Sequence, residues 1–167
     1  MARKSIKKEK SLYQEVREEL GLSRAQASEL LEGLSESQIE KIENGKTPAE
    51  PGDILLMANK YKRPDLCNYF CANECQIGQR YVPEVKIKDL PQIVLEVLAS
   101  LNTLNQKKDR FIEIAADGEL SQEEIEDFVG IKDNLRKVSI SFDALQLWLE
   151  HTISTGRMDK DLLESMD

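Results

Sequence analysis

The sequence predicts an all-α protein, with a group of short helices at its start and a long antiparallel helical hairpin, coiled-coil-like, at its end. Charged residues make up 32% of the chain and aromatic residues 5%, a mixture that suits helices with charged outer faces better than a β-sandwich. Two short segments near the start are each preceded by a serine. From residue 90 onward, apolar residues recur in steps of three and four, the period of packed helices.

A first helix is predicted at residues 12–20, where Leu12, Val16 and Leu20 fall on one face and Tyr13 flanks it. Two punctuated helices follow. One is predicted at Arg24–Leu31 after Ser23, and the other at Glu36–Asn44 after Ser35. A serine at the N-cap and a glycine such as Gly45 just past the end are typical of well-capped helices.

The two punctuated helices form a helix-turn-helix unit, whose second helix can enter a DNA major groove. Residues 35–38 also fit a capping box, because Gln38 stands at the third helical position after Ser35. The same glutamine is therefore a candidate both for capping and for contact with a base.

This stretch resembles the lambda-repressor-like (Cro/cI, or XRE) helix-turn-helix family over roughly residues 10–66. The step from Leu22-Ser23 to Leu34-Ser35 is one residue longer than is usual in that family, and we expect Glu32-Gly33 to absorb the extra residue. The resemblance rests on Leu20-Gly21-Leu22-Ser23, Ala27, Leu30-Leu31, Ser35, Ile39, Ile42-Glu43-Asn44-Gly45-Lys46, and Ile54-Leu55-Leu56-Met57-Ala58.

The resemblance implies a sequence-specific, DNA-binding transcriptional regulator that is not an enzyme. Its implied DNA contacts are Arg24, Glu36, Ser37, Gln38, Lys41 and Lys46. Residues 36–38 would face base edges, with Gln38 pairing with adenine, while Arg24 and Lys46 would bind phosphates. The third helix is acidic, because Glu36, Glu40 and Glu43 outnumber Lys41. That charge favours an alternative, a protein-interaction module on a helix-turn-helix scaffold with weak or no DNA binding.

Two further helices complete the N-terminal part. Asp53 is a candidate cap for the first, which ends with Lys60, Lys62 and Arg63, and Pro64-Asp65 begins the second. The expected buried stripe of the first is Ile54, Leu55, Met57, Ala58 and Tyr61. These patterns give three regions: a helix-turn-helix domain at 1–75, a connector at 76–91, and a helical hairpin at 92–167.

The hairpin is predicted from two helical segments, residues 90–116 and 121–154, joined by Asp117-Gly118-Glu119-Leu120. Ser121 is expected to cap the second segment, with Glu124 completing a capping box. Two helices cover their apolar stripes poorly, so we expect dimerisation through the hairpin, with docking onto the N-terminal part as the alternative. The expected seams are Leu90, Val94, Val97, Leu101, Leu104, Phe111 and Ala115 on the first segment, and Ile125, Phe128, Leu135, Val138, Phe142, Leu145 and Leu149 on the second.

Charge is distributed unevenly along the chain, whose formal net charge is −8. Residues 1–88 hold 15 Lys and Arg against 14 Asp and Glu, whereas residues 89–167 hold 8 against 17. The first ten residues, MARKSIKKEK, form a basic arm that could follow a phosphate backbone.

The expected partners are double-stranded DNA, a second copy of the chain, and possible protein ligands of the acidic hairpin. No apolar run is long enough for a membrane span, so a cytoplasmic protein without a cofactor is expected.

Three cysteines, Cys67, Cys71 and Cys75, stand four residues apart. On one continuous helix their thiols would share a face, so a thiol- or metal-responsive regulator is a further alternative, although the spacing is not that of paired zinc ligands. Residues 113–124 imitate an EF-hand loop, but Ala115 stands where a liganding oxygen is needed, and calcium binding is not expected. His151 has no partnered nucleophile and is read as a surface or packing residue.

Overall fold

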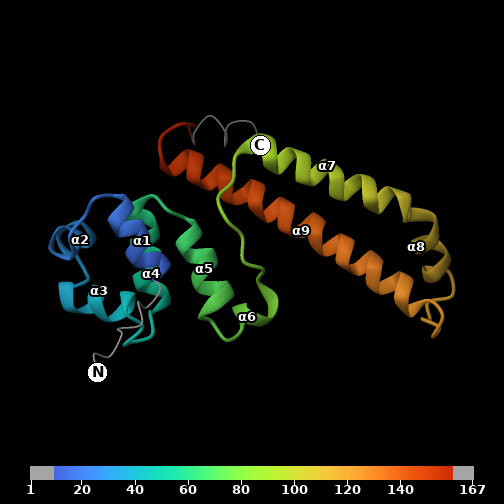
Figure 1. Cartoon of the computed structure of the whole chain (residues 1–167), viewed down its shortest axis with the longest axis horizontal. Coiled ribbons are helices and arrows are strands. Elements are labelled where there is room, and N and C mark those ends of the chain that lie inside the picture. The colour runs from blue at the N-terminus through green and yellow to red at the C-terminus, as the bar shows by residue number, and fades with distance from the viewer. Residues whose placement is uncertain (1–9, 160–167) are drawn as a thin grey trace, which may run out of the picture. The chain divides into compact units, whose positions relative to one another are not determined.

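The computed structural model describes residues 10–159, and every regular element in that range is a helix (Figure 1). None of these helices is long and apolar enough to cross a lipid bilayer. Most of the predicted basic arm, residues 1–9, lies outside the described residues. The helices are α1 Leu12–Glu19, α2 Arg24–Leu31, α3 Glu36–Glu43, α4 Pro51–Tyr61, α5 Asp65–Asn73, α6 Gly78–Tyr81, α7 Leu90–Gln106, α8 Lys108–Ala115 and α9 Ile125–Ser154.

The chain divides into two compact units. The first comprises the chain up to Glu84 together with the residues from His151 onward, and the second is Val85–Glu150. Within the first unit, the end of α9 contributes Ser154, whose hydroxyl donates to the Lys62 carbonyl oxygen over 3.3 Å.

Serine caps set the starts of the first three helices, as their sequence predicts for α2 and α3. The hydroxyls of Ser11, Ser23 and Ser35 each accept from the backbone N–H three residues later. At the end of α2, Glu32 is the C-cap and adopts the left-handed conformation with φ 53°. Gly45, with φ 63°, follows the end of α3 and reverses the chain at little conformational cost.

The predicted cap of α4 is wrong. The helix begins at Pro51, two residues before Asp53, and Glu50 occupies the N-cap position without a side-chain hydrogen bond. Proline suits this first helical position because its φ is already helical and the N–H that it lacks would have no partner there. The region predicted as a connector also contains a short helix, α6.

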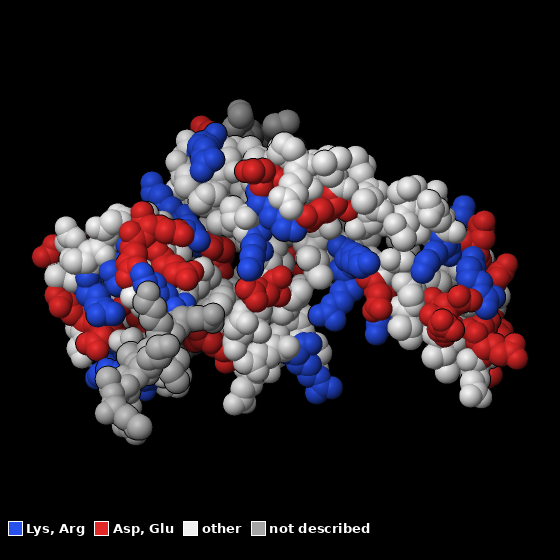
Figure 2. All heavy atoms as spheres, in the orientation of Figure 1, with Lys and Arg blue, Asp and Glu red and all other residues white. Residues whose placement is uncertain are grey.

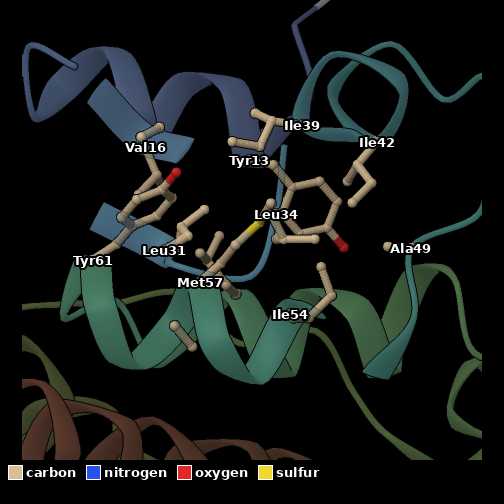
Figure 3. Close-up of a cluster of buried hydrophobic side chains, with 13 residues drawn as sticks. Tyr13, Val16, Leu31, Leu34, Ile39, Ile42, Ala49, Ile54, Met57 and Tyr61 are labelled. Atoms are coloured by element: carbon tan, nitrogen blue, oxygen red, sulfur yellow. The ribbon is translucent and has the colours of Figure 1, made fainter. Parts of the chain in front are cut away.

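The core of the first unit lies between α1, α2, α3 and α4, whose buried side chains point toward one another (Figure 3). Leu20 and Leu55 were expected in this core, but they are 46% and 56% exposed. On α4 the inward stripe is already formed by residues four and three apart, and Leu55 lies about 100° around the helix from Ile54. The fully buried members of the core include Val16, Leu31, Ile39, Ile54, Met57 and Leu66.

In the second unit, α7 and α9 run antiparallel side by side (Figure 1), so the predicted hairpin is present. Its first segment is not one helix, because α7 ends before Lys107 and α8 begins after it. Gly118 turns the chain with φ 75°. The backbone N–H and the hydroxyl of Ser121 both donate to the Glu124 carboxylate. However, α9 begins only at Ile125, so Ser121 is not its N-cap.

The predicted hairpin seams are wrong at six of their fourteen positions, and the other eight residues are half-buried. Ile93 and Ile131 are fully buried, whereas the seam residues Val94, Leu101, Leu135 and Phe142 each expose 40% or more of their surface. Each helix carries apolar residues on two adjacent stripes, and a single neighbouring helix covers only one of them. The other predicted seam residues that the structure exposes are Ala115 and Ile125.

Candidate nucleic-acid interface

A buried carboxylate joins the first three helices. Glu43, at the end of α3, has a side chain only 1% exposed. It accepts from Arg17 Nε at 2.5 Å and Nη2 at 3.0 Å, and from Arg24 Nε at 2.8 Å. Arg17 Nη1 also donates to the Leu22 carbonyl oxygen at 2.6 Å. Two cations and one anion thus meet where α1, the turn before α2, and α3 converge.

The charged form of Arg17 is favoured in this cluster. Hydrogen bonding to Glu43 raises the pKa of the Arg17 guanidinium, and this effect outweighs the opposing effect of burial. Bidentate bonding between a guanidinium and a carboxylate fixes distance and direction together. The cluster therefore sets how α3 is held against α1 and α2.

Sequence reasoning missed Arg17 and treated Glu43 only as part of an acidic helix. A signal was present, because Glu43 follows Ile42 and stands four residues after Ile39, beside the buried stripe of α3. Arg17 likewise follows the fully buried Val16. A charge next to a buried stripe at helical spacing is a candidate for a buried ion pair.

The outer face of α3 is exposed to solvent, and it presents four of the six residues expected to contact DNA. These are Glu36, Ser37, Gln38 and Lys41. The Gln38 side-chain oxygen Oε1 accepts from the Ser35 backbone N–H at 2.9 Å and from the Ser35 hydroxyl at 2.8 Å, and the Ser35 hydroxyl accepts from the Gln38 backbone N–H, so the predicted capping box is formed. The side-chain amide nitrogen of Gln38 donates no hydrogen bond to any of the described residues.

The remaining two expected contacts are engaged in ion pairs. Arg24 is one-third exposed and uses its Nε on Glu43. Lys46, just after α3, pairs with Glu40 at 3.2 Å on the surface. Arg24 is the first residue of α2, and Lys46 lies three residues beyond the end of α3.

Gln38 and Lys41 also line a hollow of about 230 Å³ between α3 and the start of α4. Thr47, Glu50 and Asp53 complete much of its wall. Figure 2 shows basic and acidic side chains interspersed on the face of this unit that is in view. The candidate interface is thus of mixed charge rather than a uniformly basic surface.

The three cysteines do not share a helix face. Cys67 and Cys71 lie on α5, but that helix ends at Asn73, and Cys75 follows it. The Cys75 sulfur accepts from the Gly78 backbone N–H at 3.4 Å. Within residues 10–159, no group of three or more His, Cys, Asp or Glu side chains is placed to hold a metal ion. The condition for three aligned thiols, one continuous helix through Cys75, is therefore not met.

Comparison with known proteins agrees with this geometry. A family model described as a helix-turn-helix domain matches residues 14–66, which span α1 to the start of α5. No curated protein and no solved structure gives a significant match to the chain. The three-helix arrangement and the family match lead to one conclusion: the N-terminal part of this chain, over residues 14–66, is a helix-turn-helix domain.

Proposed function

We propose that this chain is a sequence-specific, DNA-binding transcriptional regulator of the lambda-repressor-like type, that it acts without catalysis, and that it dimerises through its hairpin. The observation that supports this most strongly is the exposed polar face of α3. Ser37, Gln38 and Lys41 face solvent, while Ile39 and Ile42 anchor the opposite side of the same helix in the core. A helix held in this way can enter a major groove with its polar face leading.

Each exposed residue has chemistry suited to this role. A glutamine amide can pair bidentately with adenine, a carboxylate such as Glu36 can accept from cytosine N4, and Ser37 can bond either a base or a phosphate. Among the described residues, Arg24 donates only through its Nε, to Glu43. Its two terminal nitrogens can therefore donate to a phosphate. Lys41 and Lys46 would add further backbone contacts.

A second candidate function is a protein-interaction module that has little affinity for DNA. The supporting observation is the state of the cations around α3. Lys46 is paired with Glu40, Arg24 is bonded to Glu43, and Glu36 adds an exposed negative charge. Because counterion release by Lys and Arg supplies most nonspecific DNA affinity, cations already neutralised within the protein contribute less of it.

The deciding experiment is selection from a random-sequence duplex pool at several salt concentrations, with sequencing of the retained DNA. We expect a symmetric site to be enriched, with half-sites one helical turn apart. Gln38→Glu is the sharpest variant, because glutamate at this position preserves the capping box but removes the amide donor that reads adenine. We expect it to weaken binding to the selected site by about tenfold or more, with unchanged thermal stability.

Lys46→Ala provides the matched comparison for a phosphate contact. It should weaken binding to all sequences about equally and reduce the salt dependence, without changing the preferred site. If the pool yields no enriched sequence even at low salt, the DNA-binding proposal is wrong, and the protein-interaction module becomes the working hypothesis.

A further inference from the structure

The hairpin leaves a continuous apolar surface uncovered by its own two helices. On α7, Val94, Leu98 and Leu101 stand four and three residues apart and so share one stripe. On α9, Leu135 and Phe142 are two turns apart and share another. These five side chains, called here the open face, expose 40–57% of their surface.

Both stripes lie on the same side of the hairpin. Leu101 and Leu135 line one cavity of about 320 Å³ together with Leu104 and Phe111. The buried cluster of the hairpin gives the register of α7 against α9, because Ile93 and Val97 pack there with Ala144 and Ile140. Further along, Arg110 of α8 donates through its Nε to Asp127 at 2.7 Å.

Because the helices are antiparallel, this register continues one residue at a time in opposite directions. It places Leu101 level with the residue after Leu135, and Val94 level with the residue after Phe142. Leu98 then lies level with residue 139, midway between them. The open face therefore has a hollow at one end, a protruding phenyl ring about 10 Å away at the other, and Leu98 at its centre.

We infer that the open face binds a second copy of itself, with the two hairpins antiparallel and related by a two-fold axis that lies between them and crosses the helices at the level of Leu98. This specifies the homodimer of the proposed function and rests on it. In this arrangement Phe142 of each copy enters the cavity beside Leu101 and Leu135 of the other, and the two Leu98 side chains meet at the axis. The surface is self-complementary, as a two-fold interface requires.

The apolar area of the open face is large enough for the core of a dimer interface. Five large side chains, each about half exposed, offer on the order of 400 Å² of apolar surface per copy, or about 800 Å² from both. With a polar rim, that suffices for the core of an interface of standard size, about 1,200–2,000 Å² in total. Apolar patches of a few hundred Å² on a protein surface often have a function in binding.

The first test is the mass of the full chain in solution, measured by sedimentation equilibrium. We expect twice the chain mass of 19.0 kDa for the wild type, and the single chain mass for Leu98→Glu, which places two carboxylates against each other at the axis. Leu55→Glu is the matched control, because Leu55 is a helical leucine of the first unit with nearly the same exposure, 56% against 57%. It should remain dimeric.

The second test concerns geometry and uses a background in which Cys67, Cys71 and Cys75 are replaced by serine. After mild oxidation, Leu98→Cys alone should form a disulfide-linked dimer. Phe142→Cys alone and Leu135→Cys alone should not, whereas an equal mixture of these two variants should, because positions away from the axis meet unlike positions of the other copy.

The inference is overturned if the wild type is monomeric at tens of micromolar, or if Leu98→Glu and the milder Phe142→Ser both remain dimeric with native helical content by circular dichroism. Crosslinking of Phe142→Cys alone would overturn the antiparallel arrangement. These results are separable from DNA binding: a monomer that still selects a half-site leaves the regulator proposal standing, and a dimer that selects no DNA leaves the interface standing.

Discussion

The Arg17 guanidinium, on α1, donates hydrogen bonds to both carboxylate oxygens of Glu43, which lies on α3 and 26 residues later in the sequence. Its third nitrogen, Nη1, donates to the Leu22 carbonyl oxygen just before α2. One arginine therefore bonds to the two segments that bracket the helix-turn-helix unit. The angle at which α3 presents its polar face depends on a pair that is itself almost entirely buried.

Glu43→Gln should lower the free energy of unfolding by about 3–5 kcal/mol, because it removes the carboxylate that bonds the buried Arg17 guanidinium and leaves, among the described residues, only the Glu18 carboxylate, 3.9 Å away, as a counterion. The measurement is urea denaturation followed by circular dichroism. Glu40→Gln is the matched control, since Glu40 pairs with Lys46 on the surface, where such a pair contributes about 1 kcal/mol or less. Equal effects of the two variants would show that the buried pair does not hold the three helices together.

Gly78→Ala should lower the free energy of unfolding of the first unit by about 1–3 kcal/mol. A Cβ at this position would stand 1.9 Å from the Cys71 carbonyl oxygen, so the start of α6 would have to move away from α5. Gly52→Ala is the opposite case. It lies in the first turn of α4 with nothing near its would-be Cβ, and should be neutral or stabilising by up to about 1 kcal/mol. Thermal unfolding of both variants checks the pair.

The helix-turn-helix unit could be predicted closely because its signals are local. Ser23 and Ser35 cap helices that begin one residue later, and such hydrogen bonds depend only on residues three positions away. The apolar stripe of α3 was equally readable, since Ile39 and Ile42 share one face. Local rules therefore sufficed for the helices that present the candidate DNA contacts.

The buried ion pair and the hairpin seam could not be predicted in the same way. Arg17 and Glu43 each stand beside an apolar stripe, but nothing local in the sequence says that these two charges, 26 residues apart, pair with each other. On α9, the buried Ile131 and the exposed Leu135 both satisfy a helical apolar period, so periodicity cannot say which stripe faces α7. That choice is made by the register between the helices, which depends on contacts distant in sequence.

Ser35→Ala should lower stability by about 1 kcal/mol, because the hydroxyl that accepts from the Gln38 backbone N–H is lost. Ser37→Ala is the matched control. Ser37 lies two residues further along, exposed on α3, and its replacement should change stability by less than about 0.5 kcal/mol. Chemical denaturation of the two variants under identical conditions makes the comparison. A control as unstable as Ser35→Ala would show that the cap does not account for the loss.

The stability of the first unit should fall at alkaline pH, with Tyr61 as one identifiable cause. Its hydroxyl is buried, has no hydrogen-bond partner among the described residues, and points toward Val16 in the core (Figure 3). Burial, followed by the nearby Glu43 charge, raises the pKa of Tyr61 from 10.0 to about 12.

Above pH 10 the unfolded chain therefore releases this proton while the folded chain keeps it, so stability falls as the pH rises from 10 toward 12, by up to about 2–3 kcal/mol in total. Tyr61→Phe should remove that part of the decline. At neutral pH it should be neutral or stabilising by about 1 kcal/mol, because it deletes an unsatisfied hydroxyl. Urea denaturation between pH 8 and 11.5 measures both effects, with Tyr81→Phe as the control, since the Tyr81 side chain is 71% exposed. A Tyr61→Phe protein that loses as much stability as the wild type over this range would contradict the assignment, because the alkaline decline would then arise from other groups.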